Sequence, residues 1–124
     1  FGDWEFARLV TAGGDVPCME RMRFTSPHTK VFPLSLLEAV VSHPNICNQI
    51  HLPLQSGSDR ILGLMNRTYT NKEYRALVDR IRTLRPDIVL STDIICGFCG
   101  ESDTDFVATY RLIEELRFHS AFIF

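Results

Sequence analysis

Four short segments of the chain carry side chains whose types and spacing suit ligand binding. The densest is LPLQSGSD at residues 52–59, where an apolar run ends in amide, hydroxyl and glycine residues. These groups offer hydrogen bonds at the carboxyl end of a predicted parallel strand, the edge where α/β proteins bind ligands. An ordinary connection from a strand to a helix, with Ser58 as the N-cap, fits the same residues. Both interpretations stay open from this segment alone.

The other three segments also admit two interpretations each. In STDIICGFCGE at 91–101, two glycines after a strand allow close approach to a ligand, or serve only the geometry of a turn. RFTSPH at 23–28 ends in hydroxyls and His28, which suits substrate contact or proton transfer, although loop histidines are more often simply solvated. In MNRTYT at 65–70, Arg67 suits a carboxylate, or lies on the surface.

The four cysteines predict no metal site. Only Cys96 and Cys99 form a C-x-x-C pair, and no second pair accompanies them, so a zinc site is unsupported. Strand alternation places Cys96 on an aliphatic face, and we predict that it is a small core residue.

Alternating strand and helix patterns must position these segments. Strands are predicted over residues 22–26, 49–54, 88–96 and 120–124. Pro33 suits the start of one helix, Thr70 and Glu73 form a capping box for another, and Ser102 suits the cap of a third. An earlier helix is expected around Phe6, Leu9 and Val10. The third capped helix is expected to bury Phe106, Tyr110, Ile113 and Leu116.

This alternation predicts βαβ units and a parallel sheet. Along residues 50–55 and 89–97, one face is largely aliphatic, and the other carries polar groups that include His51, Gln55 and Asp93. A doubly wound sheet satisfies the same pattern, but polar groups facing a lumen favour a barrel. The predicted fold class is α/β, a partial parallel (β/α) barrel with about four strands present. Four strands of a barrel leave two unpaired edges, so we expect the segment to need neighbouring structure.

Composition narrows the class of protein further. The 124 residues are 45% hydrophobic and 23% charged, which is typical of a globular protein. No apolar run approaches the roughly 20 residues of a membrane-spanning helix, so no membrane partner is expected. The net charge of -2 gives no electrostatic footprint for nucleic acid.

Taken together and in order, the four segments resemble the radical-SAM methylthiotransferases, and the resemblance covers nearly the whole chain. The TSPH sequence at 25–28 is similar to the branch that acts on isopentenyl-type adenosine at position 37 of tRNA. The resemblance implies the radical-SAM type of barrel and an enzyme that adds a methylthio group to C2 of that adenosine. Its cofactors would be S-adenosylmethionine (SAM) and two [4Fe-4S] clusters, and its partners tRNA and an electron donor such as flavodoxin or ferredoxin.

The resemblance also assigns residues, although it implies no catalytic residue and no metal ligand within the chain. His28 would contact substrate. The implied SAM-binding residues are Ser26, Gln55, Ser56, Arg67, Asp93, Ile95, Gly97 and Phe98.

Two departures from the family pattern qualify this resemblance. The Cys-x-x-x-Cys-x-x-Cys sequence that holds the radical cluster does not occur in the chain. We therefore expect residues 1–124 to be the central part of a radical-SAM core, inactive alone, without the cluster-binding and C-terminal RNA-binding parts. The usual Gly-Phe-Pro-Gly-Glu has cysteine at position 99, as in the mitochondrial eukaryotic branch. A cytoplasmic enzyme is expected, with a mitochondrial one as the alternative.

Alternative functions remain at this point. One keeps the cofactor and changes the substrate to threonylcarbamoyladenosine tRNA or a ribosomal-protein aspartate. Another, from a different class, is a truncated non-catalytic interaction module.

Overall fold

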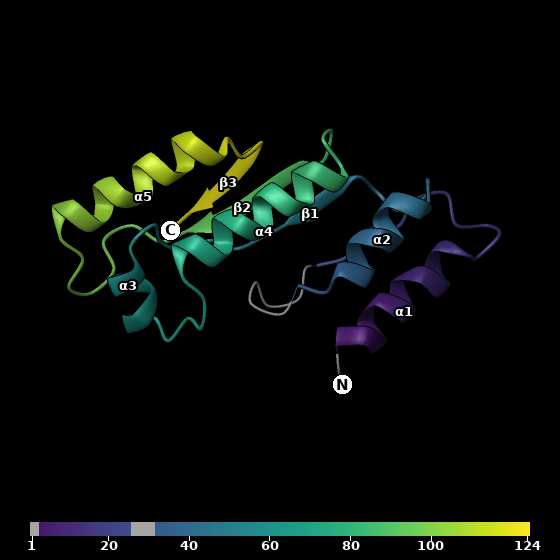
Figure 1. The fold of residues 1–124 in the computed structure, drawn as a ribbon, viewed down its shortest axis with the longest axis horizontal. Coiled ribbons are helices and arrows are strands. Elements are labelled where there is room, and N and C mark those ends of the chain that lie inside the picture. Colours follow the sequence, from purple (N-terminus) through teal and green to yellow (C-terminus); the bar gives the residue numbers. More distant parts are fainter. Residues whose placement is uncertain (1–2, 26–31) are drawn as a thin grey trace.

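The structure, a computed structural model, describes residues 3–25 and 32–124. Helices α1 (Asp3–Gly14) and α2 (Leu34–Ser42) lie side by side at one end of the molecule (Figure 1). The remaining elements follow in the chain and form the rest of the fold. They are β1 (Gln49–His51), α3 (Asp59–Leu64), α4 (Asn71–Leu84), β2 (Val89–Ile94), α5 (Asp103–Leu116) and β3 (Ser120–Ile123).

The three strands form one open parallel sheet in the order β1-β2-β3. The predicted α/β class with a parallel sheet is confirmed. The prediction of about four strands is wrong for the described residues, because only Met22 of the segment 22–26 makes a bridge, to Ile46. The Met22 N–H donates to the Asn45 carbonyl at 2.8 Å, so this segment pairs with the chain ahead of β1 and not with β1 itself.

Pairing between β1 and β2 is shorter than the sequence predicted, because Pro53 interrupts it. Proline has no N–H to donate to the ladder. The next N–H, that of Leu54, donates instead to the Thr92 hydroxyl at 2.9 Å. Main-chain pairing then resumes at Gln55, whose N–H donates to the Asp93 carbonyl at 2.8 Å. The Thr92 hydroxyl thus takes the place of a backbone acceptor. The chain after β1 therefore stays bonded to β2 as far as Gln55, at the edge of the sheet.

The predicted alternation of side chains gives the sheet one buried face and one partly open face. Helix α4 lies over the buried face in Figure 1, and the Tyr74 hydroxyl donates to the Leu52 carbonyl at 2.7 Å. Burial raises the pKa of the Tyr74 phenol, which keeps this donor protonated. The side chains of this face, all inaccessible to solvent, are Ile50, Leu52, Leu54, Leu90, Thr92 and Ile94.

The predicted helix starts are confirmed by their caps. Thr70 and Glu73 form the capping box of α4, and Ser102 forms one with Asp105 at the start of α5. Ser58 caps α3 by accepting from the Ile61 N–H. Pro33 is the N-cap of α2, one residue before the first helical turn that the sequence indicated.

The predicted buried stripe of α5 is wrong by one residue over its first half. Phe106 and Tyr110 are 47% and 54% exposed, while Asp105 and Thr109 are buried. The reason is that α5 packs on the loop after β1, which presents polar groups and not apolar ones. Two polar side chains with hydrogen-bonding partners therefore take the buried positions. Periodicity of apolar residues cannot detect such an interface.

The prediction that Cys96 is a core residue is also wrong. β2 ends at Ile94, so the strand alternation that placed Cys96 on the aliphatic face does not reach it. Its thiol is exposed, although its N–H donates to the Phe124 carbonyl at 2.8 Å.

Replacement of Gly57 by alanine is predicted to destabilise the fold severely. An added Cβ would lie 2.3 Å from the Thr109 Cα and 2.6 Å from the Ala108 oxygen, both in α5, and a main chain inside a helix cannot yield. We expect a loss of about 3 kcal/mol in the free energy of unfolding, measured by urea denaturation of the full-length protein.

Gly63→Ala is the matched control. Apart from its chain neighbours and the backbone of its own helix, no heavy atom lies within 4 Å of the Cβ position of this glycine. We expect stability to stay unchanged or to rise by up to about 1 kcal/mol. Equal losses in the two variants would contradict the packing argument.

Candidate functional site

The loop after β1 places Gln55 at the carboxyl edge of the sheet in an unusual conformation. Its φ of 69° lies in the left-handed region, which costs a residue with a side chain about 1–2 kcal/mol. Its carbonyl accepts from the Ile95 N–H at 2.9 Å, so the ends of β1 and β2 hold it from both sides. The side chain is 8% exposed, and its amide makes no hydrogen bond within the described residues. This amide is therefore available to a ligand.

The next three residues turn away from that edge and pack on α5. The Thr109 hydroxyl accepts from the Gly57 N–H at 2.8 Å and lies 3.3 Å from the Ser56 hydroxyl. The Ser56 side chain is fully buried, and its oxygen also accepts from the Ser58 N–H at 3.1 Å. In this arrangement, the Ser56 side chain stabilises the loop from within.

The loop after β2 contains two glycines in the left-handed region. Gly97 and Gly100 have φ values of 71° and 81°, and no heavy atom lies within 4 Å of either Cβ position. These glycines are needed for the backbone conformation, and the space beside them is open. The Gly97 N–H is already used, since it donates to the Glu101 carboxylate. Ile95 and Phe98 are partly exposed on either side of Gly97.

The open face of the sheet carries a hydrogen-bonded histidine. His51 lies with Nε2 3.1 Å from the Asp93 carboxylate and Nδ1 2.9 Å from the Ser91 hydroxyl. The side chains of His51 and Asp93 are each 25% exposed. Phe122 of β3 lies beside the imidazole with an edge-on ring contact of 6.1 Å. Both polar residues therefore lie on the open face, as strand alternation predicted.

Arg67 lies in the connection from α3 to α4, where its main-chain N–H donates to the Leu62 carbonyl at 2.8 Å. The Tyr69 hydroxyl fixes this connection by donating to the Leu54 carbonyl at 2.9 Å. Arg67 is partly buried, and its Nε is a buried donor with no hydrogen-bond partner among the described residues. An unpaired buried donor on a cation is costly unless a ligand satisfies it. This arrangement fits an anionic ligand group better than it fits a surface arginine.

The remaining predicted residues, Ser26 and His28, lie outside the described residues. The predicted site residues that the structure does describe fall into three groups. Gln55, Asp93 and Ile95 are joined directly by backbone hydrogen bonds, and Gly97 and Phe98 follow on the same loop. Arg67 approaches from the α3–α4 connection, and the Ser56 side chain points into α5.

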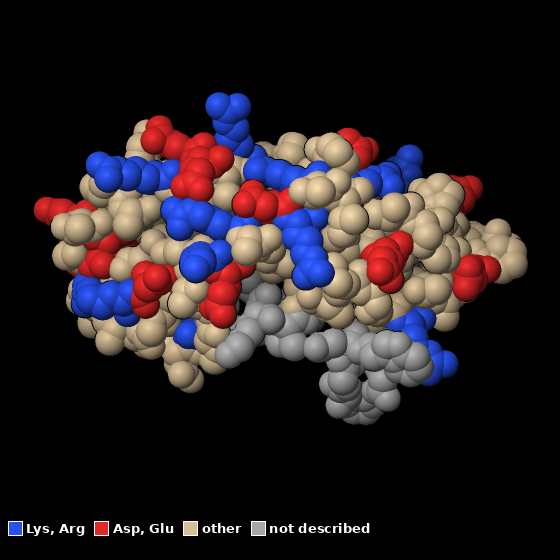
Figure 2. Space-filling model, viewed as in Figure 1, with Lys and Arg blue, Asp and Glu red and all other residues tan. Residues whose placement is uncertain are grey.

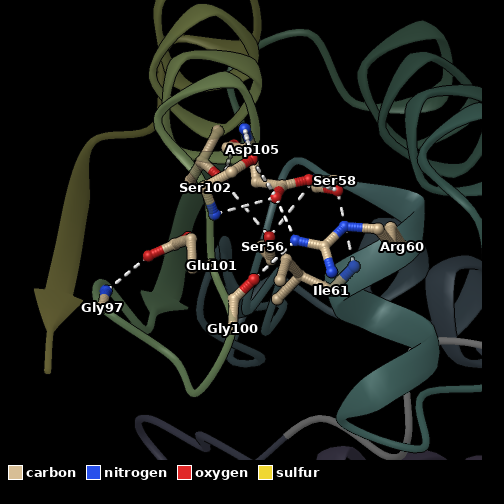
Figure 3. A network of polar contacts seen from close by, with 10 residues as sticks. Ser56, Ser58, Arg60, Ile61, Gly97, Gly100, Glu101, Ser102 and Asp105 are labelled. Carbon is tan, nitrogen blue, oxygen red and sulfur yellow. Dashed lines mark hydrogen bonds and ion pairs between the residues drawn. The ribbon is translucent and has the colours of Figure 1, made fainter.

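Sequence reasoning missed a polar network centred on Asp105 (Figure 3). One carboxylate oxygen accepts from the Ser58 hydroxyl at 2.6 Å, and the other accepts from the Ser102 N–H at 3.0 Å and from Arg60. The Arg60 guanidinium, followed by the Ser102 and Ser58 hydroxyls, holds the pKa of this carboxyl well below its usual range. The Ser-x-x-Asp spacing was a capping signal that could have identified Asp105.

The face of the molecule shown in Figure 2 carries no uniformly basic surface of the kind that binds nucleic acid. Figure 2 shows basic and acidic side chains interspersed over the face of the molecule that it presents. In the described part of the chain, no three metal-ligating side chains gather at one place. Nor does any helix there combine the length and apolar character needed to cross a membrane.

The fold and site define a parallel α/β unit with a candidate ligand-binding edge at the carboxyl ends of its strands. Residues 8–113 match the Radical SAM superfamily, and the chain belongs to that superfamily. It thereby joins a family whose enzymes use SAM together with an iron–sulfur cluster.

Curated relatives match the chain over its whole length. It is 45% identical over 125 residues to a tRNA-2-methylthio-N(6)-dimethylallyladenosine synthase of Saccharopolyspora erythraea, covering all of this chain and 26% of the relative. Proteins of the same name from Leifsonia xyli and Salinispora arenicola are 46% and 44% identical, with 23% and 25% of their lengths covered. The chain thus spans about a quarter of the length of these relatives.

Asp105 is predicted to make the stability of the fold sensitive to acid. Because its pKa is lowered in the folded state, the ionised carboxylate stabilises the fold above the ordinary carboxyl pKa of about 4. That stabilisation is lost as the pH falls below this value towards the lowered pKa. The stability difference between wild type and Asp105→Asn should therefore be largest near neutral pH and shrink below about pH 4.

Urea denaturation of both proteins from pH 7 down to about pH 3 tests this expectation. A difference that stays constant over the whole range would contradict it.

Proposed function

We propose that this chain is the SAM-binding part of a tRNA methylthiotransferase. The enzyme adds a methylthio group to C2 of an isopentenyl-type adenosine at position 37 of tRNA, with SAM as the source of the radical and the methyl group. The observation that carries the proposal is the 44–46% identity, over the whole chain, to three proteins named as synthases of that nucleoside.

The residues present fit SAM as a ligand. The buried Nε of Arg67, which has no partner among residues 3–25 and 32–124, suits the carboxylate of its methionine part. The amide of Gln55, which makes no hydrogen bond in the part of the chain that the structure describes, suits a hydroxyl of its ribose. The open space beside Gly97, next to Phe98, suits the flat adenine. Asp93 adds an acceptor on the open face, oriented by His51.

Three of the predicted residues take more limited roles in this proposal. Ser56 contributes through the loop that its buried hydroxyl stabilises, and so places Gln55. Ser26 and His28 remain candidates for SAM and substrate contact on the sequence resemblance alone.

The proposal extends to groups that other parts of the enzyme would bind. Two [4Fe-4S] clusters would be held by cysteines from outside this chain, and the sheet described here would be a section of a larger parallel barrel. The partners would be tRNA and a flavodoxin- or ferredoxin-like electron donor, and the compartment the cytoplasm. The nearly balanced net charge of -2 supports placing most phosphate contacts on another part of the protein.

The side chain of Gln55 is predicted to serve binding and not stability. In Gln55→Gly, relief of the left-handed strain offsets the greater freedom of glycine in the unfolded chain, so stability should change by less than about 1 kcal/mol. The affinity of the full-length protein for SAM, measured by titration calorimetry, should fall about three- to tenfold through loss of a hydrogen bond.

Gln49→Ala is the matched control, because Gln49 lies at the opposite end of β1. It should leave the affinity for SAM unchanged. If Gln55→Gly binds SAM like the wild type, the assignment of Gln55 to SAM is wrong.

The proposed substrate is tested by mass spectrometry of tRNA nucleosides from a strain that lacks the gene. We expect the 2-methylthio form of isopentenyladenosine to disappear and isopentenyladenosine to accumulate, and the intact gene to restore the wild-type pattern. Loss of the methylthio group from threonylcarbamoyladenosine, or from a ribosomal-protein aspartate, would favour the sister substrates. An unchanged pattern in all three would contradict a methylthiotransferase.

A further inference from the structure

Two loops of the proposed site are joined at one end by the Ile95 N–H, which donates to the Gln55 carbonyl at 2.9 Å, and further along by an arginine that no part of the proposed function uses. The loop after β1 (residues 52–58) carries Gln55, and the loop after β2 (residues 95–102) carries Gly97 and Phe98. Arg60, in the first turn of α3, donates from one guanidinium nitrogen to the Gly100 carbonyl at 2.7 Å and to the Asp105 carboxylate (Figure 3). It therefore connects the start of α3 to the loop after β2.

Asp105 fixes the position of that guanidinium. Its side chain is only 10% exposed, and it also accepts from the Ser58 hydroxyl at 2.6 Å and the Ser102 N–H at 3.0 Å. The carboxylate therefore bonds to the caps of both α3 and α5. A charged group held by several donors in a largely buried position has little freedom to move.

Hydrogen bonds hold the turn at residues 97–101, and open space lies beside both of its glycines. Neither glycine in it has a heavy atom within 4 Å of its Cβ position. Within the turn, the Gly97 N–H donates to Glu101, and the Glu101 N–H donates to the Phe98 carbonyl at 2.8 Å. The bond from Arg60 to Gly100 links this turn to the neighbouring loop from outside, so its loss should free the turn.

We propose that Arg60, oriented by Asp105, is a positioning residue that holds the turn at 97–101 in register with the loop at 52–58. The importance of this coupling for SAM rests on the proposed function, in which both loops bind the same molecule. The coupling itself is a property of the protein without ligand. It makes the position of the turn relative to the loop at 52–58 depend in part on a side chain that lies outside the site.

A second ion pair differs from the Arg60–Asp105 pair in the burial of its acid, since Arg60 is itself 53% exposed while Asp105 is 10% exposed. Arg75 of α4 donates to Glu115 of α5 at 2.8 and 3.1 Å, and these side chains are 40% and 52% exposed. That pair joins two helices and touches neither loop. Exposed pairs of this kind contribute little to stability, so Arg75→Ala is a matched control with the same change in side chain and charge.

Hydrogen exchange of the full-length protein without SAM tests the coupling. In Arg60→Ala, the amides of Gly97 and Glu101 should exchange about tenfold faster, because the turn opens locally, while the amides of α4 keep their protection. Arg75→Ala should leave the turn unchanged. Arg60→Lys should restore part of the protection, since it keeps a cation that can reach one of the two acceptors.

Each result decides the proposal. Unchanged exchange in the turn of Arg60→Ala would overturn it, and so would an increase spread equally over α4 and α5, which would indicate general destabilisation. Arg60→Gln provides a milder variant should Arg60→Ala fail to fold, with the same expected direction.

SAM affinity of the same variants separates this inference from the proposed function. If both hold, Arg60→Ala weakens SAM binding about three- to tenfold and Arg75→Ala does not. Faster exchange in the turn with unchanged SAM affinity would support the positioning role and contradict the assignment of the turn to SAM.

Discussion

The candidate site depends on the contact between the main chain of Gly57 and helix α5. A Cβ at this position would lie 2.3 Å from the Thr109 Cα, so the loop after β1 and the helix after β2 touch directly. Thr109 is buried and its hydroxyl bonds to the Gly57 N–H and meets Ser56. Because this contact fixes the loop, Gln55 is held at the carboxyl edge of the sheet, next to the end of β2.

Features of the fold that depend on local sequence could be predicted. The capping boxes at Thr70 and Ser102 involve residues three positions apart, and the two faces of the sheet follow from alternation along single strands. Features that depend on distant partners were missed. Pro53, which interrupts the pairing after β1, was visible in the sequence, but the effect of this proline depends on Thr92 as the replacement acceptor. The burial of Asp105 in place of Phe106 required the loop of residues 56–58.

In the candidate site, too, features set by local sequence could be predicted and features set by distant partners could not. The side chains of His51 and Asp93 were placed on the open face from strand alternation alone, and the structure pairs them at 3.1 Å. The orientation of Ser56 could not be predicted in this way, because it follows the strand in a loop where alternation no longer applies. Arg60 carried no signal in the sequence, since an arginine in the first turn of a helix is ordinary without knowledge of Gly100 and Asp105.

Glutamine at position 55 gives a physical reason to look for a ligand there. The backbone at this residue requires a φ of 69°, which glycine adopts freely and a residue with a Cβ adopts at a cost. The side chain makes no hydrogen bond within the described residues that would offset that cost. Backbone strain that no interaction within the fold offsets is typical of functional positions. The same reasoning applies to Arg67 in the α3–α4 connection, because its buried Nε has no hydrogen-bond partner within the described residues.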